Sequence, residues 1–147
     1  MKLKIREVKK NKSELLDFIN FAWRVYGRDP HWVPPLKTDL LNSFLGDGSD
    51  RKVNCGPHVF FMAWENNIPA GRILVGINEE KNNRNNNKVG YFGYLEFIDS
   101  FEALQILMDE AFLWLRKHNI DSLIGPLCPD DDVEGRGILI EGFDSSP

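Results

Sequence analysis

Residues 89–124 read VGYFGYLEFIDSFEALQILMDEAFLWLRKHNIDSLI and predict a strand, a helix and a second strand in succession. The first segment, residues 89–98, is rich in aromatic side chains, which favour strands. In the helix, residues 101–118, the apolar side chains recur at helical spacing and form one face, made of Leu104, Leu107, Met108, Ala111, Phe112 and Leu115. Residues 120–124 follow directly. We expect the two strands to be parallel, because a single helical crossover joins them.

Two further strands precede this unit. Residues 58–64 are apolar on both faces, which predicts a strand inside a sheet. Asn66 and Asn67 are a signal for a tight turn, so the next strand, residues 70–77, should pair antiparallel with the first. The asparagine-rich residues 78–88 predict a polar loop.

A strand and a helix begin the chain. In residues 2–8, apolar side chains alternate with Lys and Arg, as in a half-buried strand. The helix that follows is expected to be capped by Asn11 or Ser13 and to end at Gly27. Its apolar stripe consists of Leu15, Leu16, Ile19, Ala22, Trp23 and Tyr26.

A stiff loop and a short second helix come next. Prolines restrict the backbone of residues 28–35, and we expect Trp32 to anchor this loop to the core. Pro35 should lie in the first turn of the helix, which ends at Gly46. Residues 46–57 predict a mobile loop. The buried side of the helix should consist of Leu36, Leu40, Leu41 and Phe44.

The predicted order of elements is β-α-α-β-β-β-α-β. Antiparallel strands followed by one parallel crossover give a mixed sheet flanked by helices, which is the α+β class. The length of 147 residues predicts a single domain, residues 1–147, in which residues 126–147 form an acidic tail rich in Gly and Pro.

Composition excludes several classes of protein. The chain is 42% hydrophobic and 27% charged, as expected of a globular protein, and its net charge of −4 argues against a nucleic-acid partner. No apolar run reaches the ~20 residues that a membrane helix needs, and the first residues do not form a secretory signal. Two cysteines cannot build a disulfide framework, so we expect free thiols and a cytoplasmic location.

The order of elements and several short segments resemble the GCN5-related N-acetyltransferases (GNATs), and in particular an uncharacterised bacterial GNAT-like group. The segments are YGRDPHWVPPL at residues 26–36, GRI at 71–73, KVGYFGYLE at 88–96, GPL at 125–127 and GFD at 142–144. The resemblance covers nearly the whole chain. It implies a GNAT-like fold whose C-terminal part is missing.

The resemblance also implies an activity, the transfer of an acyl group from acetyl-CoA to a small-molecule or peptide amine. Glu96, with the same parity along its strand as Phe92 and Tyr94, would be the catalytic general base. The alternative is that Glu96 has no catalytic role and is a glutamate at a strand end that meets solvent or pairs with an arginine. The cofactor would contact Phe97, Ile98, Ser100 and Phe101.

One segment departs from the GNAT pattern. GNAT enzymes place a glycine-rich turn before the long helix, and its N–H groups hold the pyrophosphate of acetyl-CoA. Residues 97–103 contain no glycine but two carboxylates, Asp99 and Glu102, which resemble a capping box and would repel that anion. The alternative function is therefore a non-catalytic binding or interaction module with the GNAT fold.

Other patterns are weaker. Residues 130–141 match the spacing of an EF-hand loop, but their flanks are not helices, so we expect a solvated acidic loop and no metal. Cys55 and His58 are expected to be a loop thiol and a strand-start imidazole rather than a nucleophilic pair. Arg72 has the reach to contact a phosphate. We expect the exposed edge of the fifth strand, or the acidic tail, to be covered by the chain's own tail or by a second copy, which would make a homodimer.

Overall fold

The computed structural model describes residues 2–46, 56–127, 137–142 and 144. These residues form five strands and four helices in the described part of the chain. Their bounds are β1 (Leu3–Glu7), α1 (Lys12–Tyr26), α2 (Lys37–Leu45), β2 (His58–Glu65), β3 (Ile68–Gly76), α3 (Glu79–Asn85), β4 (Val89–Phe97), α4 (Phe101–Lys117) and β5 (Ser122–Ile124).

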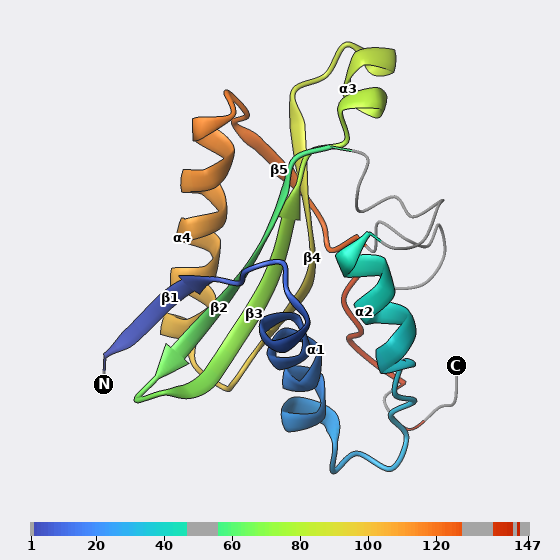
Figure 1. Cartoon of the computed structure of the whole chain (residues 1–147), viewed down its shortest axis with the longest axis vertical. Coiled ribbons are helices and arrows are strands. Elements are labelled where there is room, and N and C mark those ends of the chain that lie inside the picture. Colours follow the sequence, from blue (N-terminus) through green and yellow to red (C-terminus); the bar gives the residue numbers. More distant parts are fainter. Residues whose placement is uncertain (1, 47–55, 128–136, 143, 145–147) are drawn as a thin grey trace.

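The strands form one mixed sheet in the order β1-β2-β3-β4-β5. Strands β1 to β4 pair with one another antiparallel, and β5 runs parallel to β4, as predicted from the helical crossover. Helix α4 covers one face of the sheet, and α1 and α2 lie on the other (Figure 1). The predicted α+β class with a mixed sheet is confirmed.

Each face of the sheet has its own apolar core. The face toward α1 and α2 buries Phe18, Phe44, Phe60, Met62 and Leu74, among others. The face toward α4 buries side chains of the opposite parity, which include Phe61, Ile73, Val75, Leu107 and Leu115. The alternation along β2 and β3 therefore fills both cores, as the doubly apolar sequence of residues 58–64 indicated.

Helix α1 begins after Asn11, whose side chain accepts a hydrogen bond from the Glu14 N–H, and Gly27 follows its last residue. Phe18 was not part of the predicted stripe, yet it is fully buried at the centre of this core. Its ring makes edge-on contacts with Phe44 and Phe60, at centroid distances of 5.9 and 5.1 Å.

Four local predictions were wrong. Residues 79–85 form the short helix α3 rather than a loop, because the Asn78 side chain caps its N-terminus and Asn86 adopts the left-handed conformation that ends it. Pro35 and Leu36 both precede α2, so Pro35 does not lie in its first turn, and Leu36 is 71% exposed and does not join the buried side. Helix α4 is capped by Ser100, whose hydroxyl accepts from the Ala103 N–H, rather than by Asp99.

The edges of the sheet are β1 and β5. The β5 strand is three residues long, and Ile124 is 47% exposed. Pairing of a second copy along this edge stays a prediction. None of the helices in the described ranges combines the length and apolar composition that crossing a membrane requires.

Leu115 tests the packing of α4. It is fully buried, and it approaches the sheet where a Cβ on Gly90 would lie 2.4 Å from its Cδ2 atom. We expect Leu115→Ala to lower the free energy of unfolding by about 2–5 kcal/mol, measured by urea denaturation, because it leaves a cavity. The control Leu113→Ala, at a leucine that is 48% exposed, should stay within about 0.5 kcal/mol of wild type. If both variants lose the same free energy of unfolding, the assignment of Leu115 to the buried face of α4 is wrong.

Candidate active site

Strand β4 contains a β-bulge. Arg72 pairs with Glu96 and Leu74 pairs with Gly93, so two steps along β3 face three steps along β4. Tyr94 has a φ of 51°, the left-handed value that such an extra residue adopts. The bulge reverses the alternation of side chains along the strand.

The bulge decides which face receives Glu96. Phe92, Leu95 and Phe97 pack against the α4-side core, whereas Tyr94 packs against the α1-side core. Glu96 lies on the α1 side, because its carboxylate meets Arg72 beside α1. The expected parity was therefore half wrong: Glu96 shares the face of Tyr94 but not that of Phe92.

Arg72 is the partner of Glu96. Its Nε and Nη2 atoms lie 2.6 and 2.5 Å from Glu96 Oε2, and only 4% of the Arg72 side chain and 17% of the Glu96 side chain are exposed. The Nη1 atom donates to the backbone carbonyl of Phe18 at 2.7 Å, and the guanidinium lies over the Phe18 and Tyr94 rings. Arg72 is thus held in the core and does not reach outward toward a phosphate, which corrects that expectation.

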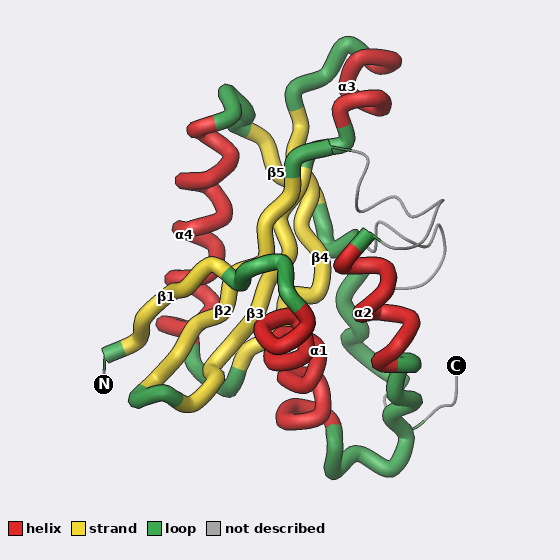
Figure 2. Tube along the Cα trace, in the orientation of Figure 1, coloured by secondary structure: helices red, strands yellow, loops and turns green. Residues whose placement is uncertain are grey.

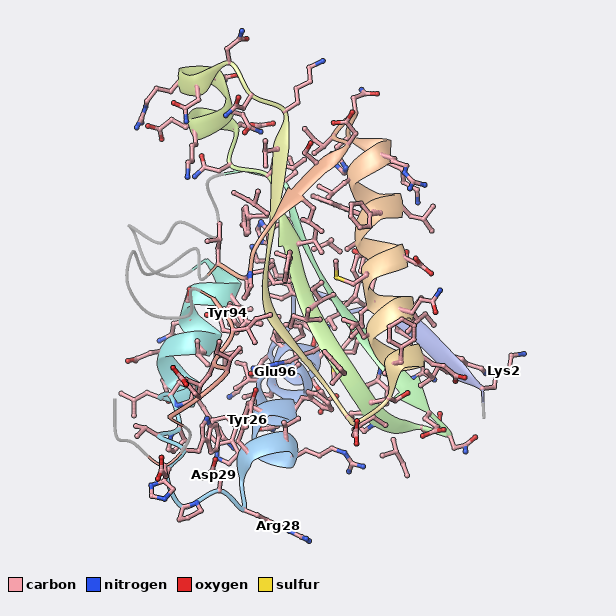
Figure 3. All side chains as sticks on the ribbon, turned by 180° about the vertical axis from the view of Figure 1, so that it is seen from behind. Lys2, Tyr26, Arg28, Asp29, Tyr94 and Glu96 are labelled. Carbon is pink, nitrogen blue, oxygen red and sulfur yellow. The ribbon has the colours of Figure 1, made fainter. Side chains whose placement is uncertain are left out.

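Tyr26, in the last turn of α1, completes the cluster. Its side chain is hydrogen-bonded to the Glu96 carboxylate, so the phenol is the donor. Figure 3 shows Tyr26 and Glu96 close together, with Tyr94 further along β4. We call Tyr26, Arg72 and Glu96 the carboxylate cluster.

The cluster perturbs both acidic groups. Burial raises the pKa of Glu96 above its usual value, although the charge of Arg72 and the hydrogen bonds from Arg72 and Tyr26 oppose the rise. Burial also raises the pKa of the Tyr26 phenol, and the nearby Glu96 charge adds to this effect. A carboxylate with a raised pKa is a better acceptor of protons near neutral pH.

The residues expected to contact the cofactor are spread around the start of α4. Phe97 faces the α4-side core, and the Ile98 N–H already donates to the Ala70 carbonyl at 2.9 Å. The Ser100 hydroxyl is used as the helix cap, while Phe101 is 76% exposed. Their role in binding a cofactor stays a prediction.

The remaining candidates do not form a site in the described ranges. The EF-hand-like segment falls mostly outside them, as does Cys55. The His58 ring lies 3.1 Å from the Gly56 carbonyl through Nδ1 and 3.4 Å from Lys10 Nζ through Nε2. Groups of three or more His, Cys, Asp or Glu side chains able to hold a metal are absent from the residues whose structure is described.

The sequence analysis allowed Glu96 to pair with an arginine, and the structure confirms such a pair, but the analysis identified neither Arg72 as the partner nor Tyr26 as a hydrogen-bond donor. The signal for Arg72 was present, because it is the single charged residue within the apolar strand of residues 70–77. A guanidinium in such a strand must find a carboxylate or carbonyl when it is buried. The sequence carried no comparable signal for Tyr26, which also fits the apolar stripe of α1.

Solved acetyltransferases share this architecture. An aminoglycoside acetyltransferase from an uncultured soil metagenomic sample, solved with trehalose, superposes with a TM-score of 0.59 at 13% identity, over 90% of this chain and 80% of that chain. A predicted acetyltransferase from Clostridium acetobutylicum, solved with acetyl-CoA, has a TM-score of 0.54 at 15% identity, over 84% and 79%. The chain therefore has the GNAT fold.

Two curated proteins are similar in sequence. Protein YghO of Escherichia coli is 31% identical over 142 residues, which are 93% of this chain and 34% of that protein. The bacterial ceramide synthase of Caulobacter vibrioides is 28% identical over 144 residues, 94% of this chain and 36% of that protein. The chain thus spans about a third of the length of these curated relatives. No protein-family model matches the sequence.

The Arg72–Glu96 pair can be tested by removing one charge and then both. Arg72→Met leaves the Glu96 carboxylate buried without its counter-charge, and we expect a loss of about 3–5 kcal/mol at neutral pH. The double variant Arg72→Met/Glu96→Leu has no buried charge and should recover most of that loss. Urea denaturation of the three proteins measures both effects. If the double variant is no more stable than Arg72→Met, the loss of stability in Arg72→Met does not come from an uncompensated Glu96 charge.

The raised pKa of Glu96 predicts a pH dependence. The folded state keeps this proton at pH values where the unfolded chain has lost it, so the contribution of Glu96 is full below the usual carboxyl pKa. It is lost as the pH rises through the raised folded value. The substituted side chain of the variant Glu96→Gln does not titrate, so the free energy of unfolding of this variant should gain on that of wild type as the pH rises above the usual carboxyl pKa.

Urea denaturation across that pH range measures this difference. The control is Glu7→Gln, at an exposed carboxylate on β1, which should follow the wild-type curve. If the Glu96→Gln curve also runs parallel to wild type, the raised pKa is wrong.

Proposed function

We propose that this chain carries the active site of an N-acyltransferase, which moves an acyl group from an acyl-CoA thioester to a primary amine. The observation that carries this proposal is the environment of Glu96. Its carboxylate is mostly buried, lies two residues past the bulge of β4 and has a raised pKa. A raised pKa moves a carboxyl group toward the range in which a general base works.

In the proposed reaction, Glu96 takes one proton from the ammonium form of the acceptor. The neutral amine attacks the thioester carbonyl carbon, so that a C–N bond forms and the C–S bond breaks. The leaving CoA thiolate ends as the thiol by taking up the second proton that the nitrogen loses. Arg72 and Tyr26 are positioning residues, since both hold the carboxylate through hydrogen bonds.

The edge of β4 supports a place for the donor. Pairing of β4 with β5 ends at Tyr91, and one further bond joins the Leu127 N–H to the Phe92 carbonyl. Beyond Phe92, no described strand pairs with β4 on its β5 side. The amides of a pantetheine chain can pair with such an edge as an added strand does. Acetyl-CoA is the donor bound in one structural neighbour.

The similar proteins support transfer to an amine. Two of the structurally similar proteins are named as aminoglycoside acetyltransferases, whose substrates carry amino groups. One relative is named as a ceramide synthase, and a ceramide is the amide of a long-chain amino alcohol. Both names describe the formation of an amide from an amine and an activated acyl group.

A second candidate is a non-catalytic binding module, which the start of α4 favours. The N-terminus of α4 is capped by Ser100, and the carboxylates of Asp99 and Glu102 lie close to it in the sequence. A pyrophosphate would meet their negative charge there. The two candidates differ in whether acyl-CoA binds at all.

The deciding experiment combines binding with turnover. In a thermal-shift titration with acetyl-CoA, a ligand at 100 times its dissociation constant adds about 2.7 kcal/mol of stability. Acyl transfer to octylamine is then followed by mass spectrometry of the amide. We expect Glu96→Gln to lower kcat/KM by about 10²–10⁴-fold while the thermal shift with acetyl-CoA persists.

The control for turnover is again Glu7→Gln, which should match wild type. A thermal shift without any amide from octylamine or an aminoglycoside would leave a CoA-binding module. No shift up to millimolar acetyl-CoA or palmitoyl-CoA would exclude the proposed reaction for this chain and favour the non-catalytic module.

A further inference from the structure

Three aromatic side chains gather beside the carboxylate cluster. Trp23 and Tyr26 come from the last part of α1, and Trp32 comes from the loop that follows it. The Trp32 ring lies 5.0 Å from that of Trp23, nearly perpendicular to it, and 5.6 Å from that of Tyr26. All three side chains are half-buried, so each keeps a part of its surface open to solvent. We call them the aromatic cluster.

The loop that carries Trp32 is held in a fixed shape. The Asp29 N–H donates to the Tyr26 carbonyl at 2.8 Å, and the Asp29 side chain accepts from the His31 N–H at 2.9 Å. Pro30 and Pro34 restrict the backbone on either side of Trp32. Figure 2 shows this loop joining α1 to α2 at one end of the molecule, away from the strands. The aromatic cluster is thus preorganised, which lowers the entropic cost of binding.

The cluster already holds one primary ammonium group. Lys37 Nζ lies 4.1 Å from the centroid of the Trp23 ring, although Lys37 itself is an exposed residue at the start of α2. An ammonium over the face of an indole is attracted by the partial negative charge of the π electrons on that face. The Lys37 ammonium therefore stands in for the same chemical group on a ligand.

Tyr26 links this ammonium position to the proposed base. Its ring belongs to the aromatic cluster, while its hydroxyl is hydrogen-bonded to the Glu96 carboxylate. Figure 3 shows the Tyr26 side chain between Glu96 and the Asp29 end of the loop. The Lys37 ammonium lies at one end of a row of rings, Trp23, Trp32 and Tyr26, and the Glu96 carboxylate lies at the other end. An ammonium bound over Trp23 would pass along these rings to reach the group that removes its proton.

Apolar side chains flank the cluster on the same loop. Val33 follows Trp32 and is 66% exposed, and Leu36 precedes Lys37 and is 71% exposed. Neither residue contributes to the two cores of the sheet. An apolar chain attached to the ammonium would cover such side chains, and burial of apolar surface is favourable by about 25 cal/mol per Å².

We propose that the aromatic cluster binds the ammonium group of the acceptor, and that this acceptor is a primary amine attached to an alkyl chain. The inference rests on the proposed function for the role of acceptor, but the binding site itself does not require turnover. The ammonium displaces Lys37 from Trp23, and the alkyl chain lies along Val33 and Leu36. A relative named as a ceramide synthase agrees with an acceptor of this class.

The four tryptophans of the chain provide the test, because each gives one indole N–H signal in a ¹⁵N-correlated NMR spectrum. Single Trp→Phe variants assign the four signals. Octylamine, which is an ammonium ion at neutral pH, should shift the Trp23 and Trp32 signals in a saturable way. The signals of Trp64 and Trp114 serve as internal controls, since those rings have their own neighbours in Arg6 and His118.

Two variants sharpen the result. Lys37→Ala removes the competing ammonium and should tighten octylamine binding, whereas Lys37→Arg, which keeps a cation, should not. Trp23→Ala removes the ring that holds the ammonium and should weaken binding by about two- to fivefold, the size of a cation–π contribution at an exposed site. Trp114→Ala is the matched control and should leave octylamine affinity unchanged. If Trp23→Ala does not fold, the Lys37 variants and the wild-type spectrum still decide.

Every outcome separates the site from the proposed reaction. 1-Octanol shifts that equal those of octylamine would overturn ammonium recognition and leave only an apolar contact. Unperturbed Trp23 and Trp32 signals would overturn the site even if acyl transfer to another amine occurs. Saturable shifts would support the site whether or not acyl transfer occurs, because the titration contains no acyl-CoA. If the separate turnover assay then gives no amide, that result counts against the proposed function alone.

Discussion

A buried guanidinium constrains the centre of this molecule. Arg72 is 3% exposed, and a charge removed from water in this way is tolerated only when its donors are satisfied. Its partners come from two different layers: the Phe18 carbonyl belongs to α1 and the Glu96 carboxylate to β4. The position of α1 on the sheet and the orientation of Glu96 are therefore fixed together. A substitution of Arg72 or Glu96 leaves a buried polar group without its partner, which costs more than the lost contact itself.

The bulge in β4 makes this arrangement possible. An unbroken strand would keep Glu96 on the same face as Phe92, toward α4. One extra residue at Tyr94 moves the Glu96 carboxylate to the α1 face, where Arg72 lies opposite it on β3. Residues 89–97 include two glycines, Gly90 and Gly93, but neither takes the positive φ, which falls on a tyrosine. The sequence therefore predicted the strand, but not the face on which Glu96 lies.

The predictable parts of the fold were those that depend on local periodicity. The apolar face of α4, the antiparallel hairpin around Asn66 and Asn67 and the parallel β5 all follow from spacing and connection length. The errors came from choices between neighbours that differ little in chemistry. Ser100 caps α4 although Asp99 is an equally good capping residue, and Asn78 starts a helix in a segment whose composition is typical of a loop. Long-range pairing decided the site, and single-sequence patterns do not contain it.

Tyr26 belongs to both the carboxylate cluster and the aromatic cluster. Through its hydroxyl it stabilises the Glu96 carboxylate, and through its ring it contacts Trp32 in the loop before α2. In the proposed reaction, Glu96 becomes neutral when it takes the proton, which weakens its attraction to Arg72 and its hydrogen bond from the phenol. The last turn of α1 and the Trp32 loop would sense that change, because the same side chain joins them to the carboxylate. In the proposed reaction, proton transfer at Glu96 would thus be coupled to the aromatic cluster, because Tyr26 contacts both.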